Sequence, residues 1–118
     1  MHNYEELKVW QRSHALLLEV YRKSQGFPRE ERFGLTAQLR KSALSVPSNL
    51  ADGCGRSTTR DFRRFVDYAG GSSKELEYQL RVALDLDYLS LQEHTELHAE
   101  LDQIQRMLRG LHKHLSRE

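Results

Sequence analysis

Apolar side chains recur at intervals of three and four residues along most of the 118-residue chain, and this spacing predicts α-helices. Four such segments can be distinguished, covering residues 5–24 and 30–55 and starting again at residues 59 and 90. No run alternates apolar and polar residues for long enough to predict a strand. Because the connections are short, we predict an all-α, antiparallel up-down four-helix bundle formed by a single domain over residues 1–118.

The fourth segment has the most regular pattern. Its leucine and isoleucine residues alternate spacings of four and three from residue 97 to residue 115, which is a heptad seam suited to packing against other helices. Ser90 followed by Glu93 predicts a capping box at its start. Three apolar residues outside the predicted core, Leu18, Val66 and Leu91, are candidates for contacts between subunits.

A run of small residues interrupts the third segment at positions 69–73 (AGGSS). Glycine costs about 1 kcal/mol in a helix interior, so the run is either a break or a site where another helix approaches closely. The apolar stripe resumes in phase beyond the run. We therefore predict a continuous helix with a close helix contact there.

The second segment contains a proline inside its apolar stripe. Pro47 removes one backbone hydrogen bond and its ring crowds the carbonyl four residues earlier, so we predict a second helix that is kinked at Pro47. Asn49 and Asp52 are polar groups able to satisfy the backbone freed by the kink. Gly53 and the glycine two positions later are then expected to end the helix and direct the following arginine toward a basic cluster.

Composition and cysteine content bound the setting of the protein. Its mean hydropathy of −0.72 and 30% charged residues are typical of a soluble protein. We expect no membrane span and no secretory signal, since no apolar run is long enough and the N-terminus lacks a basic and an apolar region. Cys54 is the only cysteine, which excludes an internal disulfide and indicates a reducing, cytoplasmic setting.

Charge is unevenly distributed although the formal net charge is only +1. Residues 29–64 carry a net charge of +4 and residues 65–118 carry −4. Arginine forks suit phosphate oxygens. We predict a nucleic-acid-binding surface made of Arg40, Lys41, Arg56, Arg60, Arg63 and Arg64. The alternatives are ion pairs with the acidic half, in the same or a neighbouring subunit, and two ordinary solvated faces.

Motifs for metal, cofactor or nucleophilic chemistry are missing. No histidine has a glutamate three residues earlier, which excludes the di-iron pattern of helical bundles, and no Walker loop is present. His94 and His98 lie one turn apart without a further evident ligand, so we expect a solvated helix face, no metal and no cofactor. Cys54 lies on the apolar stripe, which favours a small buried side chain over a nucleophile.

One enzyme-like pattern remains near the C-terminus. Arg106 with His112, or Arg109 with His114, resembles the Arg-x4–6-His motif of HEPN-type ribonucleases, which are also helical. Cations that compensate the dipole at a helix end explain these residues as well. We therefore expect a protein that is not an enzyme.

Short runs along nearly the whole chain form a combined pattern. They are residues 4–10 (YEELKVW), 27–35 (FPREERFGL), 38–43 (QLRKSA) and 45–53 (SVPSNLADG), with Gly71-Ser72 and Glu75-Leu76-Glu77 in the third segment. Together they resemble the four-helix-bundle family of 23S rRNA intervening-sequence proteins, which includes the accessory variability protein of diversity-generating retroelements. The signature positions are Pro47, Asn49, Asp52, Gly53, Glu75 and Glu77, with Asp52 standing where the family usually has glutamate.

The resemblance implies a cytoplasmic homo-oligomer, typically a pentameric ring. Retroelement members bind nucleic acid and a reverse transcriptase, so a reverse transcriptase is an expected partner only if this chain is encoded in a retroelement. We expect a non-enzymatic oligomer that binds nucleic acid, RNA more readily than DNA, through its arginine surface. Two alternatives stay open, a scaffold that binds only proteins and a HEPN-like ribonuclease.

Overall fold

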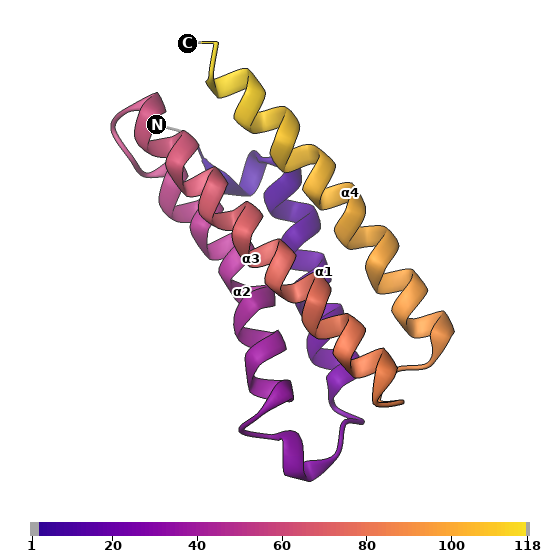
Figure 1. Ribbon diagram of the computed structural model, residues 1–118. Coiled ribbons are helices and arrows are strands. Elements are labelled where there is room, and N and C mark those ends of the chain that lie inside the picture. Colours follow the sequence, from indigo (N-terminus) through magenta and orange to yellow (C-terminus); the bar gives the residue numbers. More distant parts are fainter. Residues whose placement is uncertain (1–2, 118) are drawn as a thin grey trace.

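The computed structural model describes residues 3–117 and contains four long helices and two short 3-10 helices over that range (Figure 1). The long helices are α1 (Lys8–Ser24), α2 (Leu35–Cys54), α3 (Thr59–Asp85) and α4 (Leu91–Leu115). The 3-10 helices are η1 (Tyr4–Glu6) and η2 (Arg29–Glu31). No strand occurs among these residues, so the predicted all-α four-helix bundle is confirmed.

The helices surround one apolar core. Helix α1 packs against α2 and α4, and α3 packs against the same two helices. Consecutive helices run in opposite directions, so the α1–α2 and α3–α4 turns lie at one end and the α2–α3 turn at the other (Figure 1). The most deeply buried large side chains are Leu39, Leu50, Leu76, Leu80, Leu101 and Ile104. The periodic positions of the sequence therefore supply the core.

Helix ends follow local capping chemistry. The Ser90 hydroxyl accepts from the Glu93 amide at 3.0 Å and the Glu93 carboxylate accepts from the Ser90 amide at 2.9 Å, which confirms the predicted capping box. The hydrogen bond from the Ser90 backbone lowers the pKa of Glu93. Thr58 caps α3 by accepting from the Asp61 amide at 3.1 Å.

The start of α2 differs from the prediction. The helix begins at Leu35, because the backbone of Gly34 leaves the helical region at φ −108° and ψ −115°. The segment before it forms η2, and Phe33 is 83% exposed instead of joining the apolar stripe. The carboxylate of Glu31 accepts from the Leu35 amide at 3.1 Å and from the Tyr88 hydroxyl at 2.9 Å.

Helix α2 continues through Pro47, whose side chain is buried. The kink at this residue stays a prediction. Asn49 donates to the Ser45 carbonyl at 2.8 Å and to the Ser45 hydroxyl at 3.0 Å, whereas Asp52 accepts from Arg56 at 2.9 Å. Asp52 therefore binds a side chain and not, as predicted, the backbone near the proline.

Helix α3 is continuous across its run of small residues, as predicted. The contact is made by Ala69, Ser72 and Ser73, which are buried, and the Ser72 hydroxyl lies 2.8 Å from the Ser45 hydroxyl of α2. A Cβ added at Gly70 or Gly71 would have no heavy atom within 4 Å. The residues beside the glycines therefore provide the packing.

The exposed apolar residues match the sequence prediction only in part. Leu18 is 40% exposed and Leu91 is 72% exposed, whereas Val66 is buried at 2% and is wrong as a subunit contact. Within residues 3–117, none of the helices combines the length and the apolar character needed to cross a membrane.

Candidate nucleic-acid interface

A tight crossing of two helices positions the predicted arginine cluster. Where the end of α2 meets the start of α3, a Cβ added to Gly53 would lie 2.9 Å from the Phe62 ring and 2.9 Å from Phe65 Cβ. Only glycine fits this approach without a shift of the neighbouring helix. Gly53 is thus a contact point within α2, and Gly55 follows the helix as its C-cap.

Two arginines from this crossing share one aromatic ring. The guanidinium carbon of Arg56 lies 4.3 Å from the centre of the Phe65 ring, and that of Arg64 lies 5.5 Å from it. Each also pairs with a carboxylate, Arg56 with Asp52 at 2.9 Å and Arg64 with Asp61 at 3.5 Å. Cation–π contacts and ion pairs therefore hold both cations at the surface.

Arg60 and Arg63 complete the cluster at the first turns of α3. Together with Arg64 they line a shallow cavity of about 530 Å³, whose other lining residues include Asp61 and Asp67. Neither Arg60 nor Arg63 forms an ion pair with any residue of the range 3–117. Their guanidinium groups are available to an external anion.

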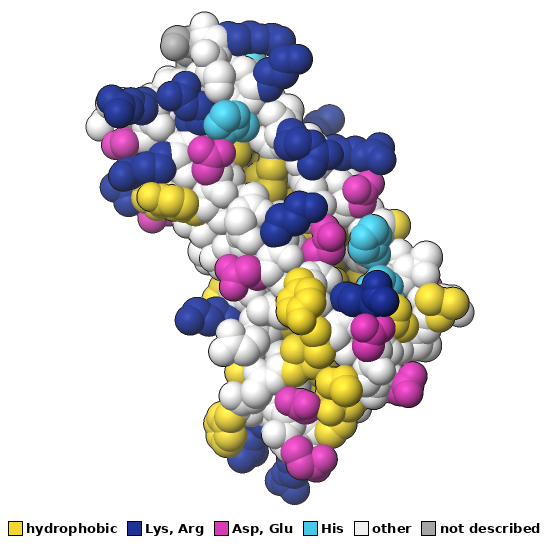
Figure 2. Space-filling model, in the orientation of Figure 1, with side chains coloured by type: hydrophobic (Ala, Val, Ile, Leu, Met, Phe, Trp, Pro, Cys, Tyr) yellow, Lys and Arg dark blue, Asp and Glu magenta, His cyan; other side chains and the backbone are white. Residues whose placement is uncertain are grey.

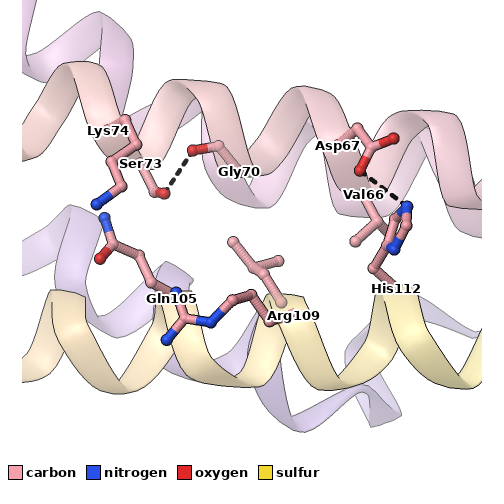
Figure 3. Close-up of a pocket in the computed structure, with 9 residues that line it drawn as sticks. Val66, Asp67, Gly70, Ser73, Lys74, Gln105, Arg109 and His112 are labelled. Carbon is pink, nitrogen blue, oxygen red and sulfur yellow. Dashed lines mark hydrogen bonds and ion pairs between the residues drawn. The ribbon is translucent and has the colours of Figure 1, made fainter.

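Helix α4 brings a second set of cations to the same place. A groove of about 440 Å³ runs between α3 and α4 and adjoins the first cavity through Asp67, which lines both (Figure 3). His112 Nε2 lies 3.2 Å from Asp67 Oδ1, which ties the end of α4 to α3. Arg109 and Lys74 line this groove, and Arg109 has no ion pair among the described residues.

The groove combines these cations with an apolar floor. Val66 and Leu108 supply the apolar part, and Gln105 donates from Nε2 to Glu77 at 3.0 Å beside Lys74. The hydrogen bond from Gln105 holds the pKa of Glu77 below its usual value. The other predicted glutamate of this segment, Glu75, is exposed.

Basic side chains consequently gather at one end of the bundle. Figure 2 shows Lys and Arg concentrated toward the end that carries the α2–α3 turn and the last turns of α4. We call this surface the basic end, and it consists of Arg56, Arg60, Arg63, Arg64 and Arg109. The acidic net charge of residues 65–118 hides the α4 contribution, because that charge averages over the whole half-chain.

Comparison with known proteins identifies the family. A family profile described as 23S rRNA-intervening sequence protein matches residues 5–110. The chain belongs to the 23S rRNA-intervening sequence protein family. Its fold is similar to that of a protein of unknown function from the S23 ribosomal protein family of Bacteroides thetaiotaomicron, with a TM-score of 0.83, 17% identity, and coverage of 89% of this chain and 98% of that one. No curated protein matches the chain.

Two predicted members of the interface lie elsewhere in the structure. Arg40 precedes Arg56 by sixteen positions, which along a helix corresponds to about 24 Å. Its Nε donates to the Ser24 hydroxyl at 2.8 Å, near the opposite end of the bundle. Arg40 and its exposed neighbour Lys41 therefore do not extend the basic end, contrary to the prediction.

The groove between α3 and α4 is lined by one residue of each enzyme-like pair, Arg109 and His112. Arg106 pairs with Asp102 at 3.1 Å and does not line the groove that holds His112. Arg109 lines that groove with His112, three positions away, whereas the sequence pattern paired it with His114. Cys54 is 1% exposed, and burial raises the pKa of its thiol, which opposes formation of the nucleophilic thiolate.

No metal-binding cluster emerges from the histidines. The rings of His94 and His98 stack with centroids 5.8 Å apart, and burial lowers the pKa of His94. Residues 3–117 contain no group of three or more His, Cys, Asp or Glu side chains arranged to hold a metal ion.

The α4 cations were missed at the sequence level. Their signal was present, since antiparallel neighbours place the last turns of a fourth helix beside the first turns of a third. From its own helix alone, Arg109 could be interpreted only as a cation that compensates the helix dipole or as part of a ribonuclease-like motif. Placing Arg109 in a groove that adjoins the cavity of Arg60 and Arg63 required the packing of α3 on α4.

Proposed function

We propose that this protein assembles into a homo-oligomer, a pentamer, whose subunits bind nucleic acid through the basic end, with RNA preferred to DNA and without catalysis. One observation carries the proposal. Arg60, Arg63 and Arg109 come from two helices to adjoining cavities, and none of them is neutralised by an ion pair within residues 3–117. Guanidinium groups without an ion-pair partner are suited to binding phosphate oxygens.

The paired arginines add to this surface at little cost. The ion pairs of Arg56 and Arg64 are solvent-exposed, and such pairs contribute about 0–1 kcal/mol. Exchange of a carboxylate partner for a phosphate is therefore inexpensive. The family description names a 23S rRNA-intervening sequence, so RNA is the first ligand to test.

Exposed apolar side chains support self-assembly. Leu91 and Tyr78 are 72% and 70% exposed, and Leu44 is 48% exposed. Apolar side chains of this size are normally covered by a partner when they form a contiguous surface. A reduced, buried Cys54 is consistent with our proposal of a cytoplasmic location. A reverse transcriptase is proposed as a partner only in a retroelement context.

Fluorescence anisotropy with labelled RNA and DNA of the same sequence tests the binding. The test variant replaces Arg60, Arg63 and Arg109 with Gln. The control replaces Arg12, Arg22 and Arg81 with Gln, which removes the same charge from arginines that are ion-paired to Glu100, Glu19 and Asp85. For single-stranded RNA, the loss of three phosphate contacts reduces the magnitude of the negative slope of log K against log salt by about 2.

The proposal expects weaker binding and a smaller salt slope for the test variant, with the control close to wild type. Wild-type protein that does not bind at low salt would instead indicate a scaffold for protein partners. Shortening of the labelled RNA, abolished by His112→Ala, would indicate the ribonuclease. Light scattering coupled to size exclusion measures the subunit number, and a monomer would contradict the assembly.

A further inference from the structure

A second arginine-rich pocket lies at the opposite end of the bundle from the basic end. It is formed by the α1–α2 turn and the start of α2 and has a volume of about 350 Å³. We call it the turn pocket, and it is lined by Ser24, Gln25, Phe27, Pro28, Arg29, Arg32, Thr36 and Arg40. Figure 1 places this turn at the far end of α2 from the α2–α3 turn.

The pocket is strongly cationic. Arg29, Arg32 and Arg40 line it, and no carboxylate does. None of the three arginines forms an ion pair with a residue of the range 3–117. Three uncompensated guanidinium groups around one cavity repel one another, and an anion in the cavity removes that repulsion.

Arg40 is held in place by the end of α1. Its Nε donates to the Ser24 hydroxyl at 2.8 Å and its Nη2 donates to the Tyr21 carbonyl at 3.3 Å. The guanidinium also lies over the Tyr21 ring, 4.6 Å from its centre. The remaining N–H groups of Arg40 are free for a ligand, and the geometry of this wall is fixed before a ligand arrives.

The start of α2 supplies a second, independent indication. Its N-cap residue Gly34 makes no side-chain cap and the first turn contains no acidic residue, so the Glu31 carboxylate, which accepts from the Leu35 amide at 3.1 Å, compensates the positive end of the helix dipole only in part. The Thr36 hydroxyl in this turn is buried and has no hydrogen-bond partner within the described residues, while the residue as a whole is 7% exposed. A buried hydroxyl without a partner is costly, and rotation of the Thr36 side chain toward the pocket that it lines would let a ligand satisfy it.

The turn itself is tied down. Glu31 accepts from the Tyr88 hydroxyl at 2.9 Å, and the Phe27 ring lies 5.5 Å from the Tyr88 ring. These contacts attach the segment that carries Arg29 and Arg32 to the α3–α4 turn. The pocket therefore needs little reorganisation on binding, which favours affinity.

We propose that the turn pocket binds a phosphate group, as the free ion or as a monoester. A phosphate dianion matches the excess positive charge and offers several oxygens to guanidinium and hydroxyl donors. Phe27 and Pro28 add apolar surface to the lining, and the volume of about 350 Å³ suits a small group.

Isothermal titration calorimetry of the full-length protein with sodium phosphate, at constant chloride concentration, tests the site. Wild type is expected to bind one inorganic phosphate per chain in the millimolar range or more tightly. Arg32→Gln removes one charged donor and should weaken binding about tenfold. Thr36→Val should weaken binding while leaving the protein at least as resistant to urea, because the unsatisfied hydroxyl is gone. A purely structural role for Thr36 would not produce that combination.

Controls locate the site and identify the source of the phosphate. Arg12→Gln, which removes an arginine that belongs to neither cationic surface, should leave phosphate binding unchanged. Adenosine 5′-monophosphate binding in addition to inorganic phosphate assigns a monoester site, and binding of inorganic phosphate alone assigns a free ion. Absence of saturable binding by both ligands overturns the proposal. Equal affinity of wild type and Arg32→Gln, or loss of binding in Arg12→Gln, does so as well.

Discussion

The crossing of α2 on α3 at Gly53 makes a quantitative prediction about stability. Replacing Gly53 with Ala places a Cβ 2.9 Å from Phe65 Cβ, a backbone-fixed atom that cannot rotate away. Overpacking of this kind costs about 1–3 kcal/mol. Alanine also improves helix propensity by about 1 kcal/mol relative to glycine, which offsets part of that cost.

A glycine-to-alanine substitution at a second site, Gly71, provides a reference for the gain in helix propensity. Gly71 is in the interior of α3, it is exposed, and an added Cβ there has no heavy atom within 4 Å. Gly71→Ala should therefore raise the free energy of unfolding by about 1 kcal/mol. Gly53 lies one residue from the end of α2 and gains no more propensity than Gly71, so Gly53→Ala should be the less stable variant by at least the contact cost of about 1–3 kcal/mol.

Urea unfolding followed by circular dichroism at one fixed protein concentration measures this difference. A fixed concentration matters because self-association adds to apparent stability. If Gly53→Ala and Gly71→Ala unfold at the same urea concentration with equal slopes, the close approach of α2 and α3 at Gly53 is refuted. Gly53→Ala is also expected to disturb the placement of Arg56, so its RNA affinity should fall with its stability.

Two further predictions concern titratable groups. Gln105→Leu removes the hydrogen bond that holds the pKa of Glu77 below its ordinary value of 4.5. Because the pKa is lowered in the folded state, the stabilisation from this bond is present above pH 4.5. It is lost as the pH falls through the folded-state pKa. The difference in unfolding free energy between wild type and Gln105→Leu should therefore shrink on acidification, and a constant difference would contradict the assignment. Cys54 should react with a thiol reagent far more slowly in native protein than in urea, since it is 1% exposed and burial raises the pKa of its thiol; equal rates would show that the α2 terminus is open.

The sequence predicted the helices and most of the core because both depend on local periodicity. Ser90 with Glu93 located the start of α4 because a capping box is formed within one turn. The start of α2 was placed five residues too early, since the Gly34 backbone and the bonds of Glu31 interrupt a stripe that is continuous in the sequence. Val66 was placed at the surface although α3 and α4 bury it.

The candidate site was less accessible to sequence reasoning because it depends on contacts between helices. Arg56 and Arg64 were grouped from their spacing, and the structure places both against Phe65. Arg40 was joined to them from proximity in sequence, but the length of α2 places it near the other end of the bundle. Arg109 became part of the surface only through the packing of two helices whose residues are distant in sequence.

The two bonds of Glu31 affect how the bundle opens. One carboxylate holds the first amide of α2 and the hydroxyl of Tyr88, fifty-seven positions away in the chain. Opening of either turn therefore breaks a hydrogen bond that stabilises the other turn. Amide protons in the two turns are expected to exchange with solvent in a single shared event, so that hairpins far apart in sequence form one cooperative unit while the α2–α3 turn opens independently.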